Sequence, residues 1–277
     1  MSVVVVTDAS ARLPPDLLDE WAIRVVPLHI LLDGVDLRDG VDQIPEDIYQ
    51  RHATTAAATP AELADAYQQA LADSGGDGVV AVHISSALSG TCGAAQRTAA
   101  DLDPHVRVVD SKSTAMGTGF VALAAARVAA AGGDLDAVAE AANSAARQTH
   151  AFMVVHQLDN LRRSGRIGGA KAWLGTALAL KPLLRIDDGK LVLAQRVRTI
   201  SHATEAMIDR VCEVVGDGPA ALAVHHVANP DGAKEVAATL ARRLPACEPA
   251  IITPLGPVLA LHVGAGAVAV VVQPPTP

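Results

Sequence analysis

The stretch Gly78-Val-Val-Ala-Val-His-Ile84, followed by Ser85-Ser-Ala-Leu-Ser-Gly-Thr91, decides how this chain folds. Its first half is an apolar run that is typical of a strand. Its second half is a turn rich in serine and glycine, and the segment after the turn is rich in alanine and has helical character. The sequence therefore predicts a strand, a turn and a helix in direct succession.

The turn from Ser85 to Thr91 also offers a place for an anion. The first N–H groups of a helix have no partner inside the helix, and the positive end of the helix dipole lies beside them. Such a helix start suits a carboxylate or a phosphate. Capping of the helix is the more common reason for any single hydroxyl here, so the interpretation depends on the rest of the chain.

In the first half of the chain, short runs of valine and isoleucine alternate with helical segments, as expected of a parallel sheet covered by helices. One helix start is clear, because Thr59-Pro60-Ala61-Glu62 combines a capping threonine, a proline and a glutamate in the order of a capping box. This helix should run to about Ala72. The predicted strands are Val3–Val6, Arg24–Ile30, Gly78–Ile84 and Val106–Val109.

The second half follows a different pattern, in which strands outnumber helices. A helix is expected from Gly132-Gly133-Asp134 to about His150, and the turn Asp187-Asp188-Gly189 indicates a hairpin. We expect an α/β fold in two domains: residues 1–150, with a parallel sheet and helices on both faces, and residues 151–277, with a mixed sheet and helices. The later predicted strands are Phe152–Val155, Leu183–Ile186, Lys190–Arg198, Ala220–His226, Ala250–Pro254 and Ala267–Val272.

Composition excludes several classes of function. Of the 277 residues, 50% are hydrophobic but only 2% are aromatic, so any cavity should have aliphatic walls. The net charge of -8 argues against a general nucleic-acid binder, which needs a basic surface. We find no secretory leader, no apolar stretch long enough for stable membrane insertion, and no cysteine spacing of a disulfide frame or zinc site. A cytoplasmic protein without a metal or cofactor is expected.

Several segments, taken in order, resemble the DegV family, the bacterial fatty-acid-binding proteins that act with a fatty-acid kinase. The resemblance covers essentially the whole chain, and the ordered set is more specific than any one member. The segments are Thr7 to Pro14, Arg38-Asp39-Gly40-Val41-Asp42, Ser85 to Thr91, Val109-Asp110-Ser111, Leu161 to Gly168, Lys181-Pro182, Val197-Arg198-Thr199 and His262-Val263-Gly264-Ala265-Gly266.

The resemblance implies a non-catalytic, lipid-binding protein of phospholipid metabolism. One long-chain fatty acid would lie between or beside the two domains, and its carboxyl group would be presented to an ATP-dependent kinase that makes the acyl phosphate. Ser89, Thr55 and His262 match the residues that bind the carboxylate in that family, and the amides of Gly90 and Thr91 add donors at the helix start. His262 would be charged near neutrality if the carboxylate raises its pKa.

One departure from the family pattern falls in the segment after Thr55. The family usually reads Thr-Ser-Gln-Pro-Ser-Pro there, whereas Ala56-Ala57-Ala58-Thr59-Pro60 follows Thr55 in this chain. Thr55 is left as the carrier of this contact, and Thr54 could replace it if the register slips. Ala265 replaces a frequent proline, a milder change, since Gly264 and Gly266 still allow a tight backbone approach.

Basic residues near the expected head group form a second set of candidates. In the family, the Gly-Arg-Ile-Gly turn and the strand with Arg-x-Arg-Thr lie near the ligand's head group, and some of these arginines dock the kinase. Arg166 and Arg198 are the best candidates here, although arginines near a helix end often remain solvated. We interpret His83, His156, His225 and His226 as structural, and Asp8, Ser10, Asp39 and Asp110 as residues that tie loops.

Two other functions stay open from the residues. A serine hydrolase of acyl esters would use Ser89 as nucleophile and His262 as base, but Ser86-Ala87-Leu88-Ser89-Gly90 lacks the Gly-x-Ser-x-Gly elbow. A nucleotide or sugar-phosphate binder would use the same anion-friendly turns, but the glycine-rich phosphate motifs are missing.

Overall fold

The computed structural model describes residues 2–167 and 181–275, and it divides into two compact units. The first unit contains Met1–Ile44 and His52–Gln148, and the second contains Pro45–Arg51 and Thr149–Pro277. The division into two domains at residue 150 stays a prediction. The fold is α/β, with a parallel sheet in the first unit and a mixed sheet in the second.

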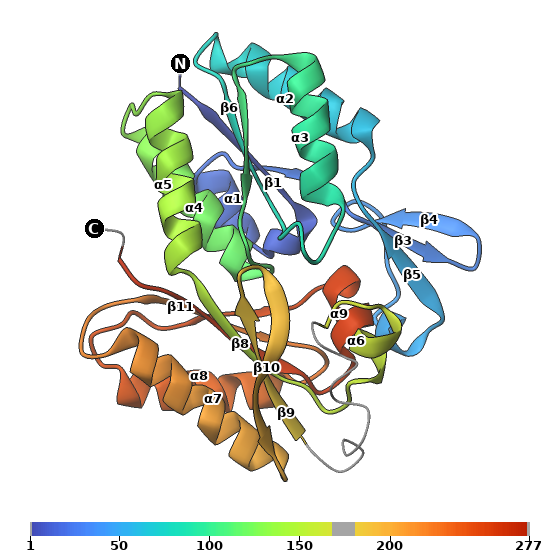
Figure 1. Ribbon diagram of the computed structural model, residues 1–277, viewed down its shortest axis with the longest axis vertical. Helices are drawn as coiled ribbons and strands as arrows, with labels where there is room; N and C mark the ends of the chain where they lie inside the picture. Colours follow the sequence, from blue (N-terminus) through green and yellow to red (C-terminus); the bar gives the residue numbers. More distant parts are fainter. Residues whose placement is uncertain (1, 168–180, 276–277) are drawn as a thin grey trace. The chain divides into compact units, whose positions relative to one another are not determined.

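The first unit is built around a four-stranded parallel sheet with the order β2-β1-β6-β7. Every residue of the central strand β6 (Val79–His83) is buried, as its apolar sequence predicts. Helices α2 and α3 pack against each other and the sheet, and α4 and α5 form a second such pair on the other side (Figure 1). The bounds are β1 (Val4–Asp8), β2 (Arg24–Val26), β7 (Val106–Asp110), α2 (Pro60–Ser74), α3 (Thr91–Leu102), α4 (Met116–Ala130) and α5 (Leu135–Gln148).

The predicted capping box is confirmed at the start of α2. The Thr59 hydroxyl accepts a hydrogen bond from the Glu62 amide at 3.2 Å, and the Glu62 carboxylate accepts one from the Thr59 amide at 3.0 Å. The helix runs to Ser74, and Gly75 ends it in the left-handed conformation. The shorter helical segments of this unit are α1 (Pro15–Glu20) and the 3-10 turn η1 (Ala9–Ala11).

A small antiparallel sheet in the first unit corrects the sequence analysis. The single strand predicted over Arg24–Ile30 is wrong, because Pro27 interrupts it and the chain changes sheets. The part before Pro27 is β2, whereas the part after it is β3 (His29–Leu32), which pairs with β4 (Val35–Arg38) and β5 (Ala53–Ala56). Thr55 therefore lies in a strand rather than in a loop before α2.

In the described part of the second unit, six strands form a sheet with the order β10-β9-β8-β13-β11-β12, in which β11 and β12 are parallel and the other neighbours are antiparallel. The hairpin at Asp187-Asp188-Gly189 is confirmed, with Asp188 and Gly189 both at positive φ. Helices α7 and α8 pack on this sheet. The bounds are β8 (His150–Val154), β9 (Lys181–Asp187), β10 (Lys190–Val197), β11 (Ala221–His226), β12 (Ile251–Pro254), β13 (Val268–Gln273), α7 (Ile200–Val215) and α8 (Pro230–Arg243).

Two short helices and a 3-10 turn of the second unit lie together. Helix α9 (Pro257–Val263) packs against α6 (Asp159–Arg163) and against η2 (Ile48–Gln50), which belongs to this unit although it comes early in the sequence. Among the helices of the described residues, none has the length and apolar character that a membrane crossing requires.

The glycine before β6 is needed for its backbone conformation and for space. Gly78 has a φ of +99°, and a Cβ added there would lie 2.8 Å from the carbonyl oxygen of His105. Gly76 has a similar φ of +106° but open space around the added atom. Gly78→Ala should therefore lower the free energy of unfolding by about 1–3 kcal/mol more than Gly76→Ala. Denaturant unfolding of both variants measures the difference, and equal losses would contradict the close packing of β6.

Candidate functional site

The carboxylate of Asp8 organises the edge of the parallel sheet where β1 and β6 end. Asp8 is fully buried and accepts hydrogen bonds from the amides of Ser10, at 3.0 Å, and Ile84, at 2.9 Å. It also bonds to Nδ1 of His83 at 3.0 Å, and Nε2 of His83 lies 2.7 Å from the hydroxyl of Tyr67. Burial alone would raise the pKa of Asp8, but the bond from His83 and those from its other donors hold it below its ordinary value.

The segment after β6 is held by backbone and side-chain bonds along its length. The Ser85 amide donates to the carbonyl of Ser113 at 2.8 Å, and the Ser89 amide donates to the carbonyl of Ser85 at 3.0 Å. The hydroxyl of Ser86 donates to the carboxylate of Asp110, at the end of β7, at 2.6 Å. These bonds connect the turn that leads into α3 to the end of β7 and to Ser113.

Two hydroxyl groups meet at the start of α3. The Oγ of Ser89 lies 2.9 Å from the Oγ1 of Thr91 and accepts a weak hydrogen bond from the Thr91 amide at 3.3 Å. Ser89 is half-buried, Thr91 is fully buried, and Gly90 between them is exposed. Gly90 is the N-cap and has no side chain that could cap the first amides of α3, and the Ser89 hydroxyl beside it bonds to the amide of Thr91. The arrangement suits an anion, as the sequence predicts, and also serves as a local cap.

The register of the small antiparallel sheet separates Thr55 from Thr54. Thr55 lies opposite Ile30, which is fully buried, and shares a face of the sheet with it. Thr54 lies opposite Leu31 on the other face, where both side chains are exposed. Of the two threonines, Thr55 is therefore the one on the buried face.

In the second unit, Arg166 lies close enough to His262 for its charge to lower the pKa of the ring. His262 lies in the last turn of α9, and the C-cap Gly264 has a φ of +78°. Burial, and then the positive charge of Arg166, lower the pKa of His262 to about 4. At neutral pH the ring is therefore uncharged, with one N–H donor and one acceptor nitrogen.

The glycines that follow α9 allow close packing that a side chain would prevent. A Cβ on Gly266, which has a φ of +83°, would lie 2.6 Å from the ring of His156. A Cβ on Gly264 would lie 3.1 Å from the amide nitrogen of Asn160 in α6. The His262 to Gly266 motif thus has a packing reason as well as a proposed ligand-binding one.

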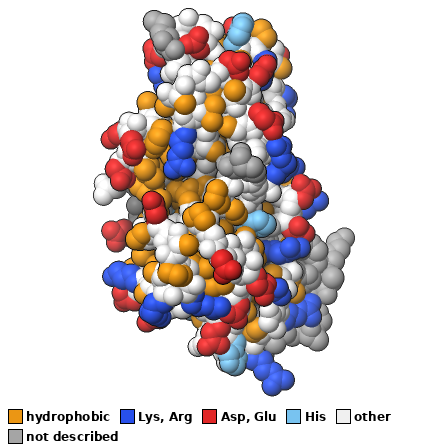
Figure 2. Space-filling model, turned by 90° about the vertical axis from the view of Figure 1, so that its left-hand side faces the viewer, with side chains coloured by type: hydrophobic (Ala, Val, Ile, Leu, Met, Phe, Trp, Pro, Cys, Tyr) orange, Lys and Arg blue, Asp and Glu red, His pale blue; other side chains and the backbone are white. Residues whose placement is uncertain are grey.

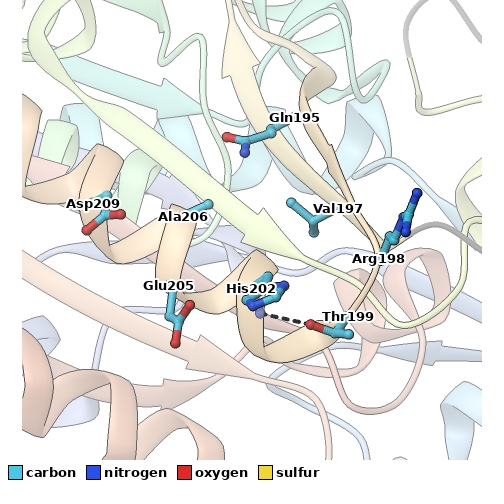
Figure 3. A pocket seen from close by; sticks show the side chains of 8 residues that line it. All are labelled: Gln195, Val197, Arg198, Thr199, His202, Glu205, Ala206 and Asp209. Atoms are coloured by element: carbon cyan, nitrogen blue, oxygen red, sulfur yellow. Dashed lines mark hydrogen bonds between the residues drawn. The ribbon is translucent and has the colours of Figure 1, made fainter.

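Arg198 lines a groove between the end of β10 and helix α7. The groove has a volume of about 520 Å³ and contains charges of both signs (Figure 3). Next to Arg198, the hydroxyl of Thr199 caps α7 by accepting a hydrogen bond from the amide of His202 at 3.2 Å. The lining residues are Gln195, Val197, Arg198, Thr199, His202, Glu205, Ala206 and Asp209.

Some of the predicted site residues lie together in the structure and others lie on different elements. Ser89, Gly90 and Thr91 lie together, while Thr55 lies on a different sheet of the same unit. In the second unit, the charge of Arg166 acts on His262, and Arg198 lines the groove beside α7. The last glycine of the Gly-Arg-Ile-Gly turn, Gly168, lies outside the described residues. In the described part of the chain, no three His, Cys, Asp or Glu side chains form a group that could hold a metal ion.

Sequence reasoning missed the hydrogen-bond network of Asp8, His83 and Tyr67. The available signal was the position of Asp8 and His83 at the ends of strands, since the carboxyl ends of parallel strands meet at one edge of a sheet. On the face shown in Figure 2, acidic and basic side chains are interspersed.

Comparison with known proteins fits this fold and these motifs. The model of the DegV family, described as a family of uncharacterised proteins, matches residues 2–275. The chain belongs to the DegV family. It is 74% identical over 273 residues to a DegV domain-containing protein of Mycobacterium tuberculosis, and the match covers 99% of this chain and 98% of the relative.

Solved structures of DegV family proteins have the same fold. One describes fatty-acid binding by a DegV family protein from Thermus thermophilus; it is 32% identical, with a TM-score of 0.91 and 99% of each chain covered. A second is DegV from Bacillus subtilis, a fatty-acid-binding protein, which is 26% identical, with a TM-score of 0.89 and 99% of each chain covered. This chain therefore has the fold of these DegV family proteins over nearly its full length.

The uncharged state of His262 can be tested by its titration. In protein without added fatty acid, the ring signals of His262 in NMR spectra should titrate near pH 4. Arg166→Gln should move the midpoint upward, because it removes the neighbouring positive charge, whereas the exposed Arg162→Gln should leave it unchanged. A midpoint at or above 6.5 in the unaltered protein would contradict the assignment.

Proposed function

We propose that this chain binds one long-chain fatty acid and presents its carboxyl group to an ATP-dependent fatty-acid kinase, which forms the acyl phosphate. The observation that carries the proposal is the hydroxyl pair of Ser89 and Thr91 at the open start of α3, in a chain whose solved relatives include fatty-acid-binding proteins. The protein itself supplies binding and orientation, while the kinase and ATP supply the chemistry.

The energies of such a complex are reasonable. Each CH₂ group removed from water contributes about 0.8 kcal/mol, so a chain of ~16 carbons gives on the order of 10 kcal/mol before the costs of association. The composition, rich in aliphatic and poor in aromatic residues, suits walls for an acyl chain. The polar residues then contribute less to affinity: their hydrogen bonds replace those that the carboxylate loses when it leaves water.

The proposed head-group residues offer different kinds of donor. Ser89 and Thr55 carry hydroxyls, and Gly90 and Thr91 carry backbone amides at the start of α3. His262 would enter as a neutral ring, so its N–H group would donate without a positive charge, and Arg166 would supply the charge beside it. A carboxylate that binds beside His262 would raise its pKa from this low starting value.

Arg198 is our candidate for contact with the kinase rather than with the fatty acid. It lies at the rim of the groove beside α7, where Glu205 and Asp209 add negative charge. A mixed charge pattern of this kind favours orientation and specificity of a protein partner more than tight binding. The kinase partner and a cytoplasmic location belong to this same proposal.

The serine hydrolase alternative receives less support. Within the described residues, the Ser89 hydroxyl bonds to Thr91 rather than to a histidine, and the buried His83 is engaged by Asp8 and Tyr67. A nucleophilic serine needs a base within hydrogen-bond reach. No contact of the described residues favours nucleotide binding over fatty-acid binding.

Alanine variants of the head-group residues test the proposal. Thr55→Ala and Ser89→Ala should each weaken the affinity for a long-chain fatty acid about tenfold, because each removes one hydrogen bond to a charged group. Thr54→Ala is the matched control, since Thr54 lies on the opposite, exposed face of β5, and it should bind as the unaltered protein does.

Displacement of a fluorescent fatty acid measures these affinities, and thermal unfolding verifies that each variant is folded. If the Thr55 and Ser89 variants both kept full affinity, the head-group assignment would be wrong. Loss of affinity in Thr54→Ala of the same size would show that the effect comes from the sheet and not from the hydroxyl.

A further inference from the structure

His29 forms two short bonds to carboxylates, although it is only 5% exposed. Its Nδ1 lies 2.8 Å from the carboxylate of Asp36, and its Nε2 lies 2.8 Å from the carboxylate of Glu62. Carboxylates only accept hydrogen bonds, so both bonds form at once only when both ring nitrogens carry a proton. The geometry therefore fits the charged ring, which ties together two acidic side chains from different elements.

These bonds connect three parts of the first unit. His29 lies in β3, Asp36 in the neighbouring strand β4, and Glu62 in the first turn of α2. The Glu62 oxygen that contacts His29 also accepts the bonds of the capping box, from the Thr59 amide at 3.0 Å and from the Thr59 hydroxyl at 2.6 Å. The ring thus links the hairpin of β3 and β4 to the start of α2.

Thr55 lies directly before the segment that this link holds, in the strand that pairs with the strand of His29. In the register of β3 and β5, His29 lies opposite Ala56, and the next residue, Ile30, lies opposite Thr55. At the other end of the segment, Thr59 is bonded to Glu62. The three residues between Thr55 and Thr59 are alanines, whose side chains offer no hydrogen bonds of their own. The side chains of His29 and Glu62 therefore add a polar connection to this segment, beside the backbone pairing of β3 with β5.

The charged groups around His29 favour its protonated form. Burial lowers the pKa of His29, but the bonds and charges of Glu62 and Asp36 more than offset this and raise it above 6.5. From β4, Arg38 lies opposite His29 in the register, and the carboxylate of Asp42 binds Arg38 through bonds of 2.8 to 3.2 Å. Strand β5 contributes no titratable side chain.

We propose that the protonated ring of His29 is a positioning device for Thr55, so that capture of the fatty-acid head group weakens when His29 loses its proton. This inference rests on the proposed function, since it assigns to Thr55 a contact with the carboxylate. His29 does not touch the ligand; it acts through β3, β5 and the Glu62 link.

The pKa shifts of His29 and Glu62 set the pH range in which the link between them is intact. Because the pKa of His29 is raised in the folded protein, its contribution is complete below pH 6.5 and is lost as the pH rises through the raised value. The pKa of Glu62 is lowered, since bonds from Thr59 and His29 outweigh its burial, so the link is lost in acid only below pH 4.5. Head-group capture should therefore be strongest in the window between these limits.

Affinity for a long-chain fatty acid measured from pH 6 to 9 tests the proposal. The unaltered protein should bind more weakly, by roughly two- to thirtyfold, as the pH rises through the titration of His29. His29→Gln, which cannot be protonated, should bind weakly with a flat profile. Asp36→Asn removes one negative charge beside His29 at an exposed position but keeps an acceptor oxygen, so it should shift the pH response to lower pH while keeping the fold. His105→Gln is the control, because His105 forms a similar bond to Asp103 but is exposed.

A separate readout distinguishes failure of this inference from failure of the proposed function. NMR titration of the His29 ring should give a midpoint above 6.5, and the amide signals from Ala56 to Thr59 should change with the same midpoint, whether or not a fatty acid binds. Identical pH profiles for the unaltered protein and His29→Gln, or a His29 midpoint at or below 6.5, would overturn the inference. If the His29 titration and the amide changes occur but no fatty acid binds at any pH, the link exists and the proposed function fails.

Discussion

The buried carboxylate of Asp8 is the interaction on which the rest of the proposed site depends. A charge removed from water must be compensated by hydrogen bonds, and Asp8 receives them from the end of its own strand and from the end of β6. The bond to the Ile84 amide sets the direction in which the chain leaves β6. Ser85 to Thr91 follow directly, so this carboxylate fixes the point from which the turn toward α3 begins, and the bonds of Ser85 and Ser86 hold the turn further along.

In the proposed site, the residues that hold the backbone in place differ from those that would touch a ligand. Asp8, His83 and Asp110 hold the turn through hydrogen bonds, while the half-buried Ser89 and the exposed Gly90 lie at the start of the helix. The same division recurs around Thr55, where the register of the small sheet selects the face and the His29 link fixes the segment that follows. In both places the groups that would touch a ligand are small and uncharged, and the charges lie in the supporting layer.

The parts of the fold that could be predicted from the sequence are those set by local pattern. The apolar run of β6, the capping box at Thr59 and the hairpin at Asp188 each depend on neighbouring residues, and the structure confirms them. The sheet of β3, β4 and β5 could not be predicted in this way, because its strands have four residues each and β4 carries two charged side chains. Pro27 was the visible sign that one strand had become two.

In the candidate site too, contacts between residues that are far apart in the sequence could not be predicted. The turn at Ser89 could be found because its residues are consecutive, whereas the bond between Asp8 and His83 joins residues 75 positions apart. His29 gave no sequence signal, since its partner Glu62 is 33 positions away and comes from another element. The choice between Thr54 and Thr55 needed the register with β3, which depends on the pairing of all three strands.

The most direct test of the account is the chemical identity of what the protein carries. The chain is purified under native conditions from a bacterial host and extracted with organic solvent, and the extract is analysed by mass spectrometry. The account predicts a long-chain fatty acid at about one molecule per chain. An extract without fatty acid, together with no rise in melting temperature when fatty acids are added, would contradict it.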